Sequence, residues 1–163
     1  MYNILIFGDS IAAGRGMEKI KSWPSLLAQR LDKKDKNSIF VHNLSIAGES
    51  TNEVLKRFPT EAEARCKKIY PDDRSSIIFA VGVNDAKYIG SKDNPVTNTE
   101  NFKDNIRLLI KGAREYTDHI IFIGLTLVDE KKTMPIDMNY FSNKRISKYS
   151  ICSLPESNAT ILA

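Results

Sequence analysis

Residues 2–16 read YNILIFGDSIAAGRG, and this stretch decides the fold. The apolar run Ile4–Phe7 is short, rich in branched side chains and ends at Gly8, which predicts a strand buried on both faces. Such strands belong to parallel sheets with helices on both faces, and ligands bind beyond the carboxyl ends of the strands. Ser10 follows the run at that edge, so the stretch predicts a hydroxyl group where folds of this kind do chemistry.

The rest of the chain alternates apolar runs with helical patterns. We expect three further strands, at 39–44, 76–81 and 119–125, and helices at about 22–31, 51–69, 99–116 and 140–149. A polar loop is expected at 87–98. Strands that alternate with helices require a parallel sheet with right-handed crossovers, so the sequence predicts an α/β fold.

Composition limits the classes of function. The chain has 163 residues, 42% hydrophobic and 27% charged, and a net charge of +4, which indicate one soluble domain. Its basic residues are mixed with acidic ones, so no nucleic-acid partner is expected. Cys66 and Cys152 have no metal-site spacing and do not indicate disulfides. The sequence shows neither a signal peptide nor a membrane-spanning run, and we expect a cytoplasmic protein with no membrane partner.

Three loops at the predicted edge carry candidate catalytic residues: Ser10, Gly48 and Asn84. The hydroxyl of Ser10, expected near a helix N-terminus, could act as a nucleophile. The backbone N–H groups of Ser10 and Gly48 and the side-chain amide of Asn84 could then stabilise an oxyanion. Each residue also has a structural interpretation: a helix cap, a turn glycine with positive φ, and an Asx-type turn at Asn84–Asp85.

The sequence gives weaker support to two other kinds of site. A phosphate cradle is disfavoured because Gly8, Gly14 and Gly16 fit neither G-x-G-x-x-G nor the P-loop pattern. A metal-assisted phosphoryl site could use Asp9, Asp85 and Thr126, since two carboxylates can hold Mg²⁺. The lysine expected after a fifth strand cannot be found, which leaves this as a distant alternative.

Four blocks of sequence together resemble a known family. They are Gly8-Asp9-Ser10 with Gly14, Trp23-Pro24, Asn43 to Gly48, and Gly82-Val83-Asn84-Asp85. Over about residues 1–150 their order and separation resemble the SGNH (GDSL-type) hydrolases. The resemblance implies a three-layer, flavodoxin-like fold and hydrolysis of a small-molecule ester without a metal or cofactor. It assigns Ser10 as the nucleophile, and Gly48 and Asn84 as oxyanion-hole donors.

One block of that family has no counterpart in the chain. The family ends with D-x-x-H, which supplies the histidine base and its orienting aspartate, and this pattern is absent from the sequence. The two histidines, His42 and His119, are expected within and at the start of strands, away from Ser10, and are interpreted as structural. The chain is therefore either an impaired esterase or a non-catalytic binding protein with the same fold.

The C-terminal residues do not fit the expected fold. We divide the chain into an incomplete hydrolase-like domain, 1–149, and an atypical tail, 150–163. The fifth strand and last helix have no obvious counterpart, as in a truncated or frame-shifted product or a naturally shortened homologue. Without a fifth strand, the outer strand of the sheet would lack a partner along one side. We expect it to be covered by another copy of the chain, giving a homo-oligomer, or by the tail segment 159–162.

Overall fold

The computed structural model describes residues 1–18, 21–34, 38–89, 94–125 and 149–151. Its main sheet has four parallel strands in the order β2-β1-β3-β5. The strands are β1 (Tyr2–Gly8), β2 (Ile39–Asn43), β3 (Arg74–Ala80) and β5 (Ile120–Phe122). This flavodoxin-like order places the polypeptide segments that follow β2, β1 and β3 beside one another at one edge of the sheet.

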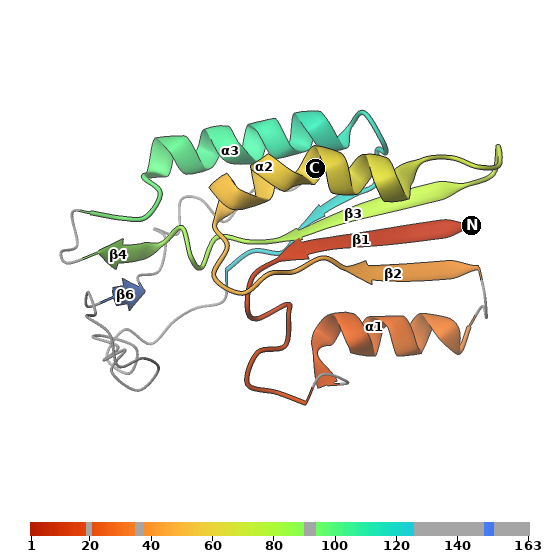
Figure 1. Ribbon diagram of the computed structural model, residues 1–163, viewed down its shortest axis with the longest axis horizontal. Coiled ribbons are helices and arrows are strands. Elements are labelled where there is room, and N and C mark those ends of the chain that lie inside the picture. Colours follow the sequence, from red (N-terminus) through yellow and green to blue (C-terminus); the bar gives the residue numbers. More distant parts are fainter. Residues whose placement is uncertain (19–20, 35–37, 90–93, 126–148, 152–163) are drawn as a thin grey trace.

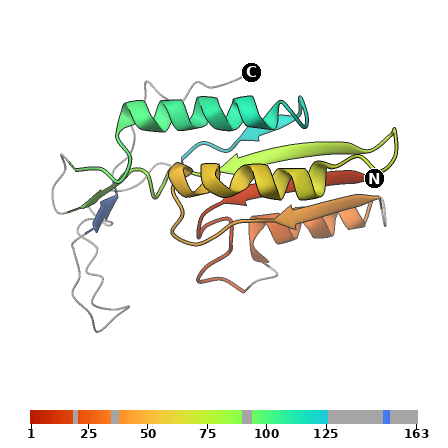
Figure 2. The same cartoon turned by 45° about the horizontal axis from the view of Figure 1, so that its top comes forward.

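Helices cover both faces of the sheet. The structure has α1 (Trp23–Asp32), α2 (Thr51–Cys66) and α3 (Thr99–Ala113). Figures 1 and 2 show α2 and α3 side by side on one face and α1 on the other. The α/β class and the three layers predicted from the sequence are confirmed.

Capping residues define where the helices begin. Ser50 and Glu53 form a reciprocal capping box at the start of α2, and the Asn98 side chain caps α3. Ser22 is the N-cap residue of α1, but its side chain makes no capping hydrogen bond. Pro24 lies in the first turn, where its missing N–H has no cost.

The main core lies between the sheet and the α2–α3 layer. Phe7 of β1 and Phe79 of β3 stack at 5.7 Å between ring centroids, and Phe58 of α2 contacts both rings. Leu5, Ile77 and other fully buried aliphatic residues complete the cluster. The strands are apolar on this face because it is sealed by two helices.

Some predicted boundaries are wrong at the amino end of β3. Helix α2 ends at Cys66 rather than near 69, and β3 begins at Arg74 rather than 76. Asp73 explains the difference, because its carboxylate accepts hydrogen bonds from the N–H groups of Ile69 and Tyr70. These bonds stabilise a turn where the apolar periodicity alone suggested more helix.

The loop expected at 87–98 contains regular structure. Lys87–Ile89 forms β4, which pairs antiparallel with β6, Tyr149–Ile151. Tyr149 is therefore in a strand and not in the predicted helix, whose other residues, like the tail segment 159–162, lie outside the described part. The strand expected at 119–125 is shorter, Ile120–Phe122. No helix within the described residues has the length and apolar character required to cross a membrane.

Candidate active site

Ser10 lies in a tight turn just beyond the carboxyl end of β1. The Asp9 carbonyl accepts a hydrogen bond of 2.9 Å from Ala13 N–H, and the Ser10 carbonyl accepts one of 2.9 Å from Arg15 N–H. Asp9 Oδ1 also accepts a 2.8 Å bond from Ile11 N–H. Helix α1 starts only at Trp23. The expectation that Ser10 lies at a helix N-terminus is therefore wrong, and so is its interpretation as a helix cap.

Gly8, the last residue of β1, lets this strand lie close to β3 and to the loop after β2. A Cβ atom on Gly8 would lie 2.6 Å from Ala12 Cβ, 2.9 Å from Ser45 Oγ and 3.1 Å from the Ala80 carbonyl oxygen. These distances are shorter than normal contacts, so a larger residue does not fit. The glycine in the sequence Gly8-Asp9-Ser10 thus has a packing role that places Ser10 between the loops that follow β2 and β3.

Gly48 lies in the loop between β2 and α2. Hydrogen bonds from Leu44 N–H to Ile6 O (2.8 Å) and from Ile46 N–H to Gly8 O (3.0 Å) hold the first part of this loop along β1. Gly48 has φ of +92°, and a Cβ atom there would touch nothing within 4 Å. The residue is exposed, and glycine is favoured by the left-handed backbone rather than by close packing.

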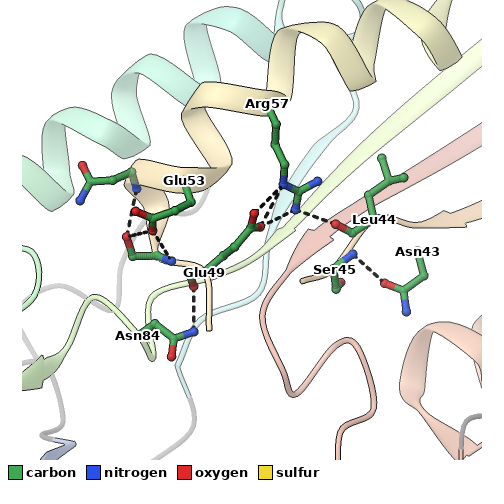
Figure 3. Close-up of polar contacts among 9 residues, drawn as sticks. Asn43, Leu44, Ser45, Glu49, Glu53, Arg57 and Asn84 are labelled. Carbon is green, nitrogen blue, oxygen red and sulfur yellow. Dashed lines mark hydrogen bonds and ion pairs between the residues drawn. The ribbon is translucent and has the colours of Figure 1, made fainter. Parts of the chain in front are cut away.

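Asn84 follows β3 and joins its loop to the Gly48 loop. The side chain is 4% exposed, and Nδ2 donates a 2.8 Å hydrogen bond to the carbonyl of Glu49 (Figure 3). Asp85 accepts hydrogen bonds from Thr51 N–H (3.1 and 3.0 Å) and from the Thr51 hydroxyl (2.6 Å). Asn84 bonds to the loop before α2 and Asp85 bonds to the first residue of α2, so the interpretation of Asn84–Asp85 as an Asx-type turn is wrong.

A buried polar network continues from Asp85 into the helices. Asn105 of α3 donates to the Thr51 hydroxyl (2.8 Å) and to Asn52 Oδ1 (2.9 Å), and Asn52 donates to Thr97 (3.1 Å). Thr51 is fully buried and Asn105 is nearly so. The network fixes the start of α2, and hence the end of the Gly48 loop, against α3.

An ion pair that the sequence did not predict holds this loop. Arg57 Nε donates to both oxygens of the Glu49 carboxylate, at 2.9 and 3.0 Å, and its Nη2 lies 2.6 Å from Glu49 Oε2. The two residues are eight positions apart. They do not share a helix, so the spacing rule that finds ion pairs within helices could not reveal this one.

Three hydrogen-bond donors at this edge are available to a ligand. Within the described part of the chain, the N–H groups of Ser10 and Gly48 have no hydrogen-bond partner. The Asn84 amide has two hydrogens, of which Glu49 takes one. The three residues follow adjacent parallel strands, as predicted, and the Glu49 carbonyl links Asn84 to the residue next to Gly48.

An apolar pocket of about 170 Å³ is lined by residues on both sides of Ser10 in the sequence, although Ser10 itself does not line it. Its walls come from Asp9 and Ile11 after β1, Trp23 of α1, Val83 after β3 and the segment 123–125 after β5, with Ala12, Ala80 and Val81 completing the lining. Burial raises the pKa of the Asp9 carboxyl, although the Ile11 N–H and the charge of Lys87 oppose this shift.

Neither histidine lies at this edge. His119 precedes β5, at the opposite end of the sheet, and lines a separate polar hollow there. His42 is in the middle of β2, where its Nε2 lies 3.0 Å from Asn3 Oδ1. Burial and, to a smaller extent, the charge of Arg65 lower the pKa of His42. Both positions agree with the structural roles predicted from the sequence.

The carboxylates considered for a metal have other partners. Asp9 bonds to Ile11 N–H and Asp85 to Thr51, whereas Thr126 lies outside the described residues. Among the residues that the structure describes, no group of three or more His, Cys, Asp or Glu side chains could hold a metal ion. The geometry thus gives the metal-assisted phosphoryl alternative no support.

Several solved structures have a similar fold. TesA is 23% identical (TM-score 0.62, 77% of this chain and 61% of TesA). The psychrotrophic esterase EstA from Pseudoalteromonas sp. is 20% identical (TM-score 0.60, 79% and 62%), and the SGNH-hydrolase family esterase AlinE4 is 23% identical (TM-score 0.60, 78% and 60%). The chain therefore spans about three fifths of the length of these proteins, and the likeness shows the fold.

Comparison of sequences gives the family directly. A search of curated proteins finds no match to the chain. The sequence pattern of the GDSL-like Lipase/Acylhydrolase family, in contrast, matches residues 6–150, which include the end of β1, Ser10 and the loops that carry Gly48 and Asn84. On this match, which covers most of its length, the chain belongs to the GDSL-like lipase/acylhydrolase family.

Proposed function

We propose that this chain carries the nucleophile and the oxyanion hole of a serine hydrolase that cleaves acyl or acetyl carboxylic esters. The observation that carries the proposal is the set of unused donors at one sheet edge: Ser10 N–H, Gly48 N–H and one hydrogen of the Asn84 amide. The proposal requires these donors to converge beside the Ser10 hydroxyl, the arrangement that attacks a carbonyl and stabilises the resulting oxyanion.

In the proposed reaction, the hydroxyl oxygen of Ser10 attacks the ester carbonyl carbon. The hydroxyl proton passes to a water molecule, and water later supplies the proton with which the alcohol departs. The carbonyl oxygen becomes an oxyanion and accepts hydrogen bonds from Ser10 N–H, Gly48 N–H and Asn84 Nδ2. When the tetrahedral intermediate collapses, the alcohol leaves and an acyl group remains on Ser10. Water then hydrolyses this acyl-enzyme through a second oxyanion held by the same donors.

The proton of Ser10 has no imidazole to accept it within this chain. Both histidines are at other sites, so the hydroxyl stays a weak nucleophile at neutral pH. Removing a member of a catalytic triad lowers kcat about 10⁴- to 10⁶-fold, and the oxyanion hole still supplies a small remaining rate enhancement. We therefore propose slow turnover for the chain by itself. The alternative, a binding protein with the same pocket, predicts no turnover.

Turnover of p-nitrophenyl acetate by the wild type and by Ser10→Ala tests the proposal. We expect a slow wild-type rate above background that the substitution abolishes. Since Ser10 bonds to its neighbours only through its carbonyl in the described structure, Ser10→Ala should fold normally. Equal rates for the two proteins would contradict the esterase proposal and leave the binding protein as the better interpretation.

A further inference from the structure

Arg57 of α2 holds the loop that carries Gly48 at two separate points. Its guanidinium donates hydrogen bonds to the Glu49 carboxylate from both Nε and Nη2. Nη2 also donates a 2.6 Å hydrogen bond to the Leu44 carbonyl (Figure 3). Leu44 begins the loop just after β2, and Glu49 is its last residue before the cap of α2. One planar cation thereby fixes the separation between the two ends of the loop.

The same guanidinium contacts the strand that leads to Ser10. The Arg57 Cζ atom lies 5.4 Å from the centre of the Phe7 ring, within the range of a cation–π interaction. Phe7 is fully buried, and only Gly8 and Asp9 separate it from Ser10. Arg57 therefore sets the position of the loop relative to β1, beyond fixing the loop itself.

Glu49 stands between two of the proposed oxyanion-hole donors. The Gly48 N–H belongs to the preceding residue, whose left-handed φ of +92° is a conformation open to rearrangement if the loop were released. The Glu49 carbonyl accepts the bond that orients the Asn84 amide. A displacement of Glu49 would thus move both donors, one through the backbone and the other through a hydrogen bond.

We propose that Arg57 is a positioning residue for the oxyanion hole, acting through Glu49; this inference rests on the function proposed above. Arg57 does not touch the reacting atoms. Its bidentate bond holds the Gly48 N–H and the Asn84 amide at the place where negative charge develops. Misplacing such groups by about 1 Å can reduce a rate by about 100-fold.

A second arginine–glutamate pair on α2 gives a matched control. Arg65 pairs with Glu61 one turn away on the same helix, and neither residue contacts the loops of the site. The Arg65 and Glu61 side chains are 32% and 31% exposed, compared with 18% and 12% for Arg57 and Glu49. Loss of either pair removes one ion pair made by an arginine of α2, but only the loss of Arg57 should displace the donors.

The test compares Arg57→Leu, Arg57→Lys, Glu49→Gln and Arg65→Leu with the wild type. Ester hydrolysis and the rate at which a fluorophosphonate labels Ser10 are measured for each protein. We expect Arg57→Leu to lower kcat and the labelling rate about 100-fold with little change in KM, because an oxyanion forms only after substrate has bound. Arg57→Lys should keep only part of the wild-type kcat and labelling rate, since an ammonium group cannot make the bidentate contact. Arg65→Leu should have the kcat and the labelling rate of the wild type.

Added guanidinium ion should partly rescue Arg57→Leu and leave Arg65→Leu unaffected. A folded Arg57→Leu with wild-type rates would overturn the inference, as would an equal loss in Arg65→Leu. If Arg57→Leu does not fold, Glu49→Gln decides, because it keeps the shape and the backbone carbonyl but weakens the grip of the arginine. Glu49→Gln with wild-type rates would then overturn the inference.

Nuclear magnetic resonance separates this inference from the proposed function. If the wild type neither hydrolyses esters nor labels, the proposed function fails, and the backbone amide signal of Gly48 and the side-chain signals of Asn84 still report on positioning. We expect both sets to shift or broaden in Arg57→Leu and to stay in place in Arg65→Leu. Unchanged signals in Arg57→Leu would contradict the positioning role.

Discussion

The amide of Asn84 and the carbonyl of Glu49 are joined by a hydrogen bond of 2.8 Å, which ties the loop after β3 to the loop after β2. Asn84 is almost fully buried, so its amide has few alternative orientations. The bond uses one of two amide hydrogens and leaves the other available to a ligand. In the proposed reaction, this bond would hold the Asn84 amide in place for an oxyanion before any substrate binds.

Asn84→Ala should reduce ester hydrolysis more than substrate binding. Loss of one oxyanion-hole donor typically lowers kcat about 10²- to 10³-fold, with a smaller effect on KM. Steady-state kinetics, or the rate of Ser10 labelling by a phosphonate, measures the change. Asn94→Ala is the control, because Asn94 is exposed and, among the described residues, its side chain donates to the Ile89 carbonyl of β4 and not to a loop of the site. An unchanged kcat in Asn84→Ala would remove this residue from the proposed site.

Gly8→Ala should destabilise the protein by about 1–3 kcal/mol, the usual cost of overpacking a tight site. The new methyl group would meet Ala12 Cβ at 2.6 Å and the Ala80 carbonyl at 3.1 Å, and neither is the end of a flexible side chain. Urea unfolding measures the loss. At Gly124, where a Cβ atom would have no neighbour within 4 Å, the same substitution should have little effect. Similar stabilities for the two variants would argue against this packing.

Asp85→Ala should lower the free energy of unfolding by about 3 kcal/mol, because it leaves the buried N–H and hydroxyl of Thr51 without their acceptor. Chemical denaturation provides the measurement. Asp104→Ala is a suitable comparison: its carboxylate pairs with Arg107 on the surface, where an ion pair contributes at most about 1 kcal/mol. If Asp85→Ala lowered the free energy of unfolding no more than Asp104→Ala does, the hydrogen-bond network around Asp85 would contribute little to stability.

Acid should remove a specific stabilising contribution from Asp73. The bond from the Met1 ammonium group and the N–H of Tyr70 lower the pKa of its carboxyl from 3.8 to about 2. Because the folded-state pKa is below the unfolded value, the contribution is complete above about pH 4 and is lost as the pH falls through about 2. Asp73→Asn should therefore be less stable than the wild type at pH 7, and the difference should shrink between pH 4 and pH 2.

Thermal unfolding of both proteins across that pH range tests the assignment. Asp72→Asn, at the exposed neighbouring position, serves as the control and should follow the wild-type curve. A difference between wild type and Asp73→Asn that stayed constant down to pH 2 would mean that Asp73 titrates normally in the folded state.

Local patterns were enough to predict the sheet and the placement of the site residues on it. The apolar run before Gly8 and the corresponding runs before the other two loops determine β1, β2 and β3, and parallel strands bring their carboxyl ends to one edge. Ser10, Gly48 and Asn84 are all located there. This part was predictable because it depends on periodicity and topology, both of which are visible in the sequence.

What could not be predicted depends on contacts between distant residues. Nothing near Asp73 in the sequence shows that its carboxylate binds two N–H groups and shortens α2. The pairing of β4 with β6 joins segments about 60 residues apart, which a polar composition does not reveal. The Arg57–Glu49 pair likewise spans a loop, and only the folded structure shows it.

One expectation about the sheet edge still awaits an experiment. Ile121 and Ile123 of the β5 segment are 50% and 42% exposed, as anticipated for an apolar surface at the edge of the sheet. That a second copy of the chain covers this surface remains a prediction, and light scattering across a concentration series would measure it. A monomer at every concentration would contradict it.

A crystal structure of the chain after reaction with a phosphonate ester would show whether the proposed donors meet at one oxygen atom. We expect phosphorus bonded to Ser10 Oγ, with one phosphoryl oxygen about 2.7–3.1 Å from both the Gly48 nitrogen and Asn84 Nδ2. A phosphoryl oxygen that faces solvent, away from these two donors, or a phosphonate bonded to another residue, would contradict this expectation.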